Sequence, residues 1–166
     1  MELLKYINIE LLEYIHKGGI IVYILIFLNV IGFTIIIWKF LTILRKKSIL
    51  KKIESKIDKT NIKTLEIQIE YEVKRLEGGL TYIKNIASIA PLLGLLGTVY
   101  GVYLAFDQIT QKGLGDPTVF SGGISIALIT TITGLIVAIP HHIAYNHFIS
   151  IIDTIELKAK KELINK

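Results

Sequence analysis

Three long stretches of the sequence contain no aspartate, glutamate, lysine or arginine: Gly18–Trp38, Asn85–Phe106 and Pro117–Ile152. They comprise 21, 22 and 36 residues and together cover nearly half of the 166-residue chain. An α-helix rises about 1.5 Å per residue and the hydrocarbon core of a bilayer is about 30 Å thick, so about 20 apolar residues span it. Each stretch is long enough. The sequence therefore predicts an all-α integral membrane protein with three transmembrane helices.

The rest of the composition argues against several other classes of protein. The chain is 52% hydrophobic and has no cysteine, which excludes a disulfide scaffold, a thiolate metal site and a cysteine nucleophile. The net charge of +5 in so apolar a chain indicates membrane topology rather than nucleic-acid binding. The spaced glycines of Leu93–Gly101 lie inside a span and not after a strand, so they do not indicate a dinucleotide site. We expect no enzyme activity, no cofactor and no metal site.

The charged residues delimit the segments that we expect along the chain. These are an N-terminal interfacial helix at 1–17, a transmembrane helix at 18–44, a cytoplasmic helical hairpin at 45–83, a transmembrane helix at 84–106, a short periplasmic loop at 107–120, a transmembrane helix at 121–146 and a cytoplasmic C-terminal helix at 147–166. Membrane lipid is the expected partner of the first segment, with a protein partner as the alternative. Charges before the first apolar stretch, and no small-residue cleavage site after it, indicate a retained anchor rather than a signal peptide.

The distribution of basic residues predicts the orientation. Of the 19 lysines and arginines, 11 lie in residues 45–84 and four in the C-terminal tail, against two in the N-terminal segment and one in the 107–116 loop. Cytoplasmic loops carry the excess of basic residues. The N-terminus is therefore expected outside and the C-terminus inside. The third apolar stretch is longer than a bilayer requires, so its helix should continue into the cytoplasm.

Small residues recur every three or four positions in the second and third spans, which places each set on one helix face. The second span has Gly94, Gly97 and Gly101, and the third has Gly134 in the same kind of row. Small residues let helix backbones approach closely in lipid. The rows predict close packing, either between these two spans or between subunits.

Polar residues within the spans suggest two candidate sites. Thr98 and Thr131 lie mid-span, where a threonine hydroxyl either bonds a carbonyl of its own helix or lines a pore. A proton carrier normally needs an ionisable group inside the membrane, and these spans have no Asp, Glu, Lys or Arg. The chain thus either moves no protons or uses a group from a partner. His141 and His142 follow Pro140 and point to different helix faces, with a packing role, a cytoplasmic proton exit and metal binding as the alternatives.

Two ordered runs of sequence resemble a known family. Ala87–Gly101, which reads ASIAPLLGLLGTVYG, is similar to the second-span signature of the MotA/TolQ/ExbB proton channel family. The run from Gly115 to Asn146 is similar to the third-span pattern of the same family. The resemblance covers about residues 76–146. It implies a homopentameric ring in the bacterial inner membrane, with a pore lined by the second and third spans.

The resemblance also implies partners and roles. Single-span ExbD- or TolR-like subunits inside the ring would supply a proton-binding aspartate, with Thr98 and Thr131 facing the pore near it. Three spans and a modest size look most like the ExbB branch, which energises TonB-dependent transport at the outer membrane through a TonB-like protein. The alternatives are a TolQ-like subunit for envelope integrity and constriction, a gliding-motor relative, and a membrane scaffold that conducts nothing.

The sequence departs from the family pattern at two places. Many ExbB and TolQ sequences have a glutamate on the third span where this chain has Ile126. Either this chain works without that carboxylate, or its proton route differs there. His141 and His142 stand where apolar residues are usual after the proline.

Overall fold

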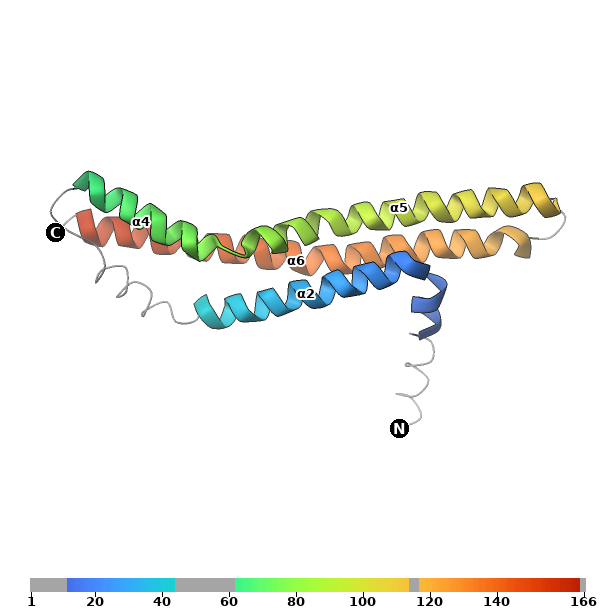
Figure 1. Cartoon of the computed structure of the whole chain (residues 1–166), viewed down its shortest axis with the longest axis horizontal. Coiled ribbons are helices and arrows are strands. Elements are labelled where there is room, and N and C mark those ends of the chain that lie inside the picture. Colours follow the sequence, from blue (N-terminus) through green and yellow to red (C-terminus); the bar gives the residue numbers. More distant parts are fainter. Residues whose placement is uncertain (1–11, 44–61, 114–116, 165–166) are drawn as a thin grey trace, which may run out of the picture. The chain divides into compact units, whose positions relative to one another are not determined.

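A computed structural model describes residues 12–43, 62–113 and 117–164, and the regular structure in these ranges is helical. Helix α2 spans Gly19–Ile43, α4 spans Ile62–Glu77, α5 spans Leu80–Lys112 and α6 spans Thr118–Ile164 (Figure 1). Residues 12–17 form a short helical segment before α2. Most of the expected interfacial helix and residues 45–61 of the expected hairpin lie outside the described residues.

Three of these helices are long and apolar enough to cross a bilayer. They are α2, α5 and the Phe120–Lys161 part of α6. The prediction of an all-helical protein with three such helices is therefore confirmed.

Glycines in the left-handed region set several helix ends. Gly79, at φ 89°, separates α4 from α5, and Gly113, at φ 78°, ends α5 with its N–H donating to the Ile109 carbonyl at 2.8 Å. Helix α5 therefore continues through residues 107–112, which we expected in the loop. The end of the apolar run does not end the helix, because Gln111 donates to the Asp107 carboxylate one turn earlier, at 2.9 Å, and supports a further polar turn. Helix α6 likewise runs unbroken from the third span into the expected C-terminal helix, through Pro140.

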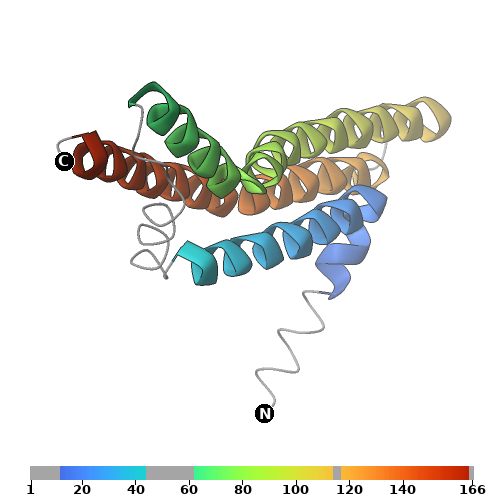
Figure 2. The same ribbon diagram turned by 60° about the vertical axis from the view of Figure 1, so that its left-hand side comes forward.

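The chain divides into two compact units. The first contains the described residues up to Ile31 together with Asn85–Pro140, that is the first half of α2, most of α5 and the first half of α6. Here α5 and α6 run side by side in opposite directions (Figures 1 and 2). Leu25 of α2 is fully buried in a cluster with residues of both helices: Ile86, Ala90, Val137 and Ala138. This cluster attaches α2 to the α5–α6 pair.

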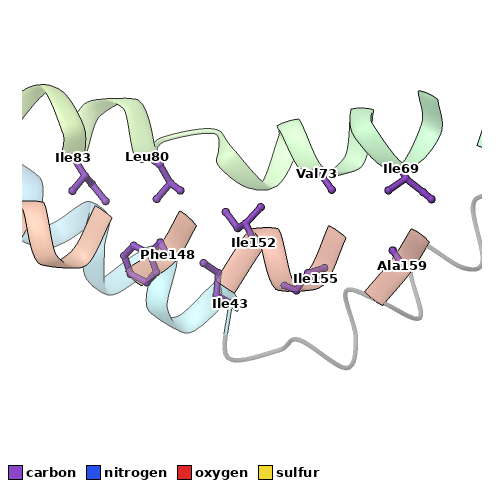
Figure 3. Close-up of a cluster of buried hydrophobic side chains, with 9 residues drawn as sticks. All are labelled: Ile43, Ile69, Val73, Leu80, Ile83, Phe148, Ile152, Ile155 and Ala159. Carbon is purple, nitrogen blue, oxygen red and sulfur yellow. The ribbon is translucent and has the colours of Figure 1, made fainter. Parts of the chain in front are cut away.

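The second unit contains the described residues within 32–84 and 141–166, and α4 and the second half of α6 contribute most of its core. Nine buried apolar side chains form this core (Figure 3): Ile43, Ile69, Val73, Leu80, Ile83, Phe148, Ile152, Ile155 and Ala159. Ile69 and Val73 lie one turn apart, so the amphipathic α4 presents a single apolar face to the cluster.

Among the described residues of the second unit, two polar side chains are buried. Lys39 is 6% exposed, and its ammonium donates to the Leu76 carbonyl at 2.6 Å. That carbonyl belongs to the last turn of α4, where carbonyls lack a partner in the helix and the helix dipole favours a cation. His141 is fully buried, and its ring meets the ring of Phe33 edge-on, with centroids 5.3 Å apart. Both side chains tie α2 to neighbouring helices of this unit.

Candidate functional site

The small-residue rows of α5 and α6 face each other within the first unit. Glycines 94, 97 and 101 of α5 and 123 and 134 of α6 are all buried. A Cβ placed on Gly101 would stand 2.5 Å from the Gly123 carbonyl oxygen, and one on Gly134 would stand 2.7 Å from the Ala90 carbonyl oxygen. The backbones are therefore in direct contact along this seam. The sequence allowed these rows to pack either between the second and third spans or between subunits. In the structure the second and third spans of the same chain pack against each other through them.

Gly94 and Gly97 of α5 lie against Thr130 and Thr131 of α6. A Cβ on Gly94 would lie 3.0 Å from the Thr130 carbonyl oxygen and 3.2 Å from the Thr131 Cα. Gly97 makes room in the same way for the side chain of Thr130, which would lie within 2.6 Å of an added Cβ. Because α5 and α6 approach so closely here, side chains as short as threonine reach across from one helix to the other.

Thr98 of α5 and Thr131 of α6 form an interhelical hydroxyl pair. Their Oγ1 atoms are hydrogen-bonded to each other, and either can donate. The Thr98 hydroxyl also lies 3.2 Å from the Gly94 carbonyl and 3.4 Å from the Ala127 carbonyl, and the Thr131 hydroxyl lies 3.4 Å from the Gly94 carbonyl. Each hydroxyl has a single proton to donate. Whichever threonine donates to the other, the accepting threonine can donate its own proton to a nearby backbone carbonyl.

The hydroxyl pair lies beside an exposed apolar surface. Both threonines are partly buried. Large exposed apolar side chains lie three or four residues away on the same helix faces: Leu95 and Val102 on α5, and Leu128 and Leu135 on α6. Leu95 is 59% and Leu128 60% exposed in the single chain. These two hydroxyls therefore adjoin apolar side chains that the single chain leaves exposed.

The neighbouring threonines are placed differently. Thr130 is fully buried and donates to the Ile126 and Ala127 carbonyls of its own helix, at 2.9 and 3.0 Å. Thr133 is 8% exposed and donates to the Ile129 carbonyl at 2.7 Å. Both therefore bond carbonyls of their own helix and contribute no free hydroxyl to the exposed surface.

The two candidate histidines have different environments. His141 is buried, and a Cβ on Gly32 would overlap its imidazole ring. The histidine ring therefore packs directly against the backbone of α2 at Gly32. His142 is exposed. The structure does not bring the two side chains together on one surface.

Sequence reasoning missed several residues of the N-terminal end of the first unit. Tyr14 donates its hydroxyl to the Ile129 carbonyl of α6 at 3.3 Å. Lys17 pairs with Glu13 at 2.8 Å and borders cavities next to α6. The role of Gly32 was missed as well, because a lone glycine in an apolar span gives no row of small residues to follow. The i, i+4 spacing of Glu13 and Lys17 was the one available signal.

The sequence pattern of the MotA/TolQ/ExbB proton channel family matches residues 40–161, well over half of the chain. The chain belongs to this family. Both members of the hydroxyl pair lie within the matched region, as do the glycines of the α5–α6 seam. A family of proton channels and three apolar helices together make this chain a multi-pass membrane protein.

Individual relatives carry two names. The chain is 42% identical over 74 residues to the biopolymer transport protein ExbB of Neisseria gonorrhoeae, which covers 45% of this chain and 34% of the relative. It is 40% identical over 93 residues to ExbB of Aquifex aeolicus, covering 56% and 62% of the two chains. It is 32% identical over 100 residues to the Tol-Pal system protein TolQ of Haemophilus influenzae, covering 60% and 44%.

The similarity covers only part of the length of each of these relatives. The match spans about a third of the Neisseria relative, at 34%. Similarity to proteins of both names supports a proton-channel subunit of this family.

Proposed function

We propose that this chain is an ExbB-like subunit of a proton-driven motor in the bacterial inner membrane. It would assemble as a homopentameric ring with the N-terminus outside and the C-terminus in the cytoplasm. The open face of α5 and α6 would line the pore, around single-span ExbD- or TolR-like helices that each supply a proton-binding aspartate. Through a TonB-like protein the complex would energise transport at the outer membrane.

The observation that carries the proposal is the hydroxyl pair beside exposed apolar side chains of α5 and α6. Thr98 and Thr131 bond each other rather than only their own helices, next to exposed leucines that need a cover. The apolar stretches have no Asp, Glu, Lys or Arg of their own. A proton that crosses on this face therefore needs an ionisable group from a partner.

The chemistry of the pair suits a carboxyl group that gains and loses a proton. A hydroxyl donates to a carboxylate and accepts from a carboxylic acid, so it serves both states. An aspartate at the centre of a membrane helix costs about 2.5–3.5 kcal/mol. A hydrogen bond to a charged group contributes about 1.5–3 kcal/mol, so one or two threonine hydroxyls offset most of that cost. The pair would thereby ease deprotonation of the partner's aspartate.

Two features of the chain support secondary parts of the proposal. The burial of His141 against Gly32 favours a packing role for this histidine, and the exposed His142 is then the candidate for proton exit. The excess of basic residues at 45–84 supports a cytoplasmic hairpin. A TolQ-like role in envelope integrity is the second candidate, favoured by the similarity to the TolQ relative.

The test compares two threonine variants of the co-expressed complex in proteoliposomes. Thr131→Val removes a hydroxyl of the open face, whereas Thr133→Val removes a buried one that bonds its own helix. We expect Thr131→Val to lower partner-dependent proton flux about tenfold or more, because one charge-assisted hydrogen bond is lost, and Thr133→Val to leave it within about twofold. Equal flux in the two variants contradicts the role of the pair.

Native mass spectrometry of the same preparation tests the assembly. A pentamer that holds a dimer of the single-span partner supports the motor. A monomer or dimer that ignores the partner favours the non-conducting scaffold. Gene neighbours and rescue of strains lacking ExbB or TolQ would then separate the two branches.

A further inference from the structure

Two adjoining cavities of the first unit lie where α2 and α6 begin. The larger has a volume of about 530 Å³ and is lined by Lys17, Ser121, Gly122, Ser125 and Ile126. The smaller has a volume of about 200 Å³ and is lined by Glu13, Tyr14, Lys17, Ser125 and Ile129. Lys17 and Ser125 border both cavities. The larger cavity is within the range of small-molecule sites, about 300 to 1,000 Å³, and the smaller one adjoins it.

The polar groups of these cavities carry one positive and one negative charge. The Lys17 ammonium lies 2.8 Å from the Glu13 carboxylate, and both side chains are more than half exposed. The Ser121 hydroxyl donates to the Thr118 carbonyl at 3.0 Å, which leaves its oxygen free to accept. Within the described part of the chain the Ser125 hydroxyl has no hydrogen-bond partner, so it is available to donate. A ligand with a net charge of either sign would meet one repelling group, whereas a dipolar ligand would match both.

The position of the cavities along the helices indicates a membrane interface. Lys17 is the last charged residue before the charge-free stretch Gly18–Trp38, so it marks the point where the polar chain meets the apolar span. Ile126 and Ile129 form apolar walls of the cavities. Ile20, three residues after Lys17 at the start of α2, is 75% exposed and offers apolar surface. A molecule bound there would have its polar end at the charged pair and an apolar part along the helices.

We propose that these cavities bind the phosphoethanolamine headgroup of a membrane phospholipid. The phosphate would bind the Lys17 ammonium and the serine hydroxyls, and the primary ammonium would bind the Glu13 carboxylate. A phosphocholine headgroup has the same two charges, but its quaternary ammonium has no N–H to donate. A phosphoglycerol headgroup is an anion and would meet the carboxylate uncompensated. The proposal requires only that the chain lies in a membrane and does not depend on proton conduction.

The experiment places the full chain in nanodiscs of equal parts phosphatidylethanolamine, phosphatidylcholine and phosphatidylglycerol. Native mass spectrometry after mild detergent release counts the lipids that stay bound. We expect phosphatidylethanolamine to be enriched about threefold over each of the others. A preference of this size is what one partly exposed contact between charged groups contributes to binding. Equal retention of the three lipids overturns the proposal, and enrichment of phosphatidylglycerol instead assigns an anion site.

Paired variants locate the effect. Lys17→Gln and Glu13→Gln should each abolish the enrichment while circular dichroism shows unchanged helix content, since the pair is largely exposed. Lys112→Gln and Asp107→Asn change the charge equally at the end of α5, outside the cavities, and should leave it intact. Soluble glycerophosphoethanolamine at the same headgroup concentration should not displace the lipid. Displacement, or enrichment that survives Lys17→Gln, contradicts a lipid held at these residues.

Discussion

Gly101→Ala tests whether backbone contact between α5 and α6 holds the first unit together. A Cβ at this position would stand 2.5 Å from the Gly123 carbonyl oxygen, 2.6 Å from the Ala127 nitrogen and 3.0 Å from the Ala127 Cα. All three atoms belong to the backbone of α6, so no side-chain rotation relieves the overlap. The two helices must move apart, and the contacts along the seam loosen with them.

Gly122→Ala is the matched control, because nothing lies within 4 Å of the added Cβ. Replacing glycine by alanine in a helix contributes up to about 1 kcal/mol through propensity, and both variants gain it. Forcing an extra carbon into a packed contact costs about 1–3 kcal/mol. The difference between the two variants therefore isolates the steric cost, and we expect Gly101→Ala to be less stable than Gly122→Ala by about 1–3 kcal/mol.

The assay is reversible unfolding in mixed micelles, followed by circular dichroism, with both variants at equal protein and detergent concentration. Spin labels on exposed positions of α5 and α6 report the interhelical distance in parallel. The reasoning is refuted if Gly101→Ala is as stable as Gly122→Ala, or if its stability falls without any increase in the distance between the labels.

Two further predictions concern side chains in the second unit and at the N-terminal end of the first. Gly32→Ala should destabilise the protein by about 1–3 kcal/mol, because its Cβ overlaps the His141 ring, and His141→Ala should relieve most of that cost in the double variant. Additive losses of stability in a double-mutant cycle would contradict this contact between Gly32 and His141. The hydrogen bond and charge of Lys17 hold the pKa of the Glu13 carboxyl below its ordinary value of 4.5. The stabilisation from this pair is thus present above the ordinary pKa and is lost as the pH falls through the lowered one. Carbon NMR titration should show the pKa of Glu13 rising in Lys17→Gln, and an unchanged titration would disprove the pairing.

The sequence was sufficient to predict the helices, because charge marks the limits of a membrane span. The absence of charged residues from Gly18–Trp38, Asn85–Phe106 and Pro117–Ile152 predicted the three spans. Their ends were predicted less well. Helix α5 ends at Lys112, beyond the apolar run, since a polar helical turn stays stable until a residue with positive φ, here Gly113, stops it.

The positions of the candidate residues could be predicted only where they follow a periodic pattern. Spacings of three and four residues put Gly94 and Gly101 on one face of α5, and mid-span position selected Thr98 and Thr131 as candidates. That these two hydroxyls bond each other depends on how α5 and α6 are aligned, which one sequence does not contain. The fit of His141 on Gly32 depends in the same way on the packing of α2, and no repeat marked it.

The contacts that hold α5 to α6 also create the hydroxyl pair, and this limits how the proposed motor can move. The Gly94 carbonyl lies within hydrogen-bond distance of both Thr98 and Thr131, and it is there because Gly94 has no side chain to keep α6 away. Sliding one helix along the other would drive backbone atoms into each other at Gly101 and break the pair at the same time. Closely packed interfaces change between discrete arrangements and do not deform continuously. Motion during proton transfer is therefore expected between this helix pair and its partner, with the α5–α6 seam intact.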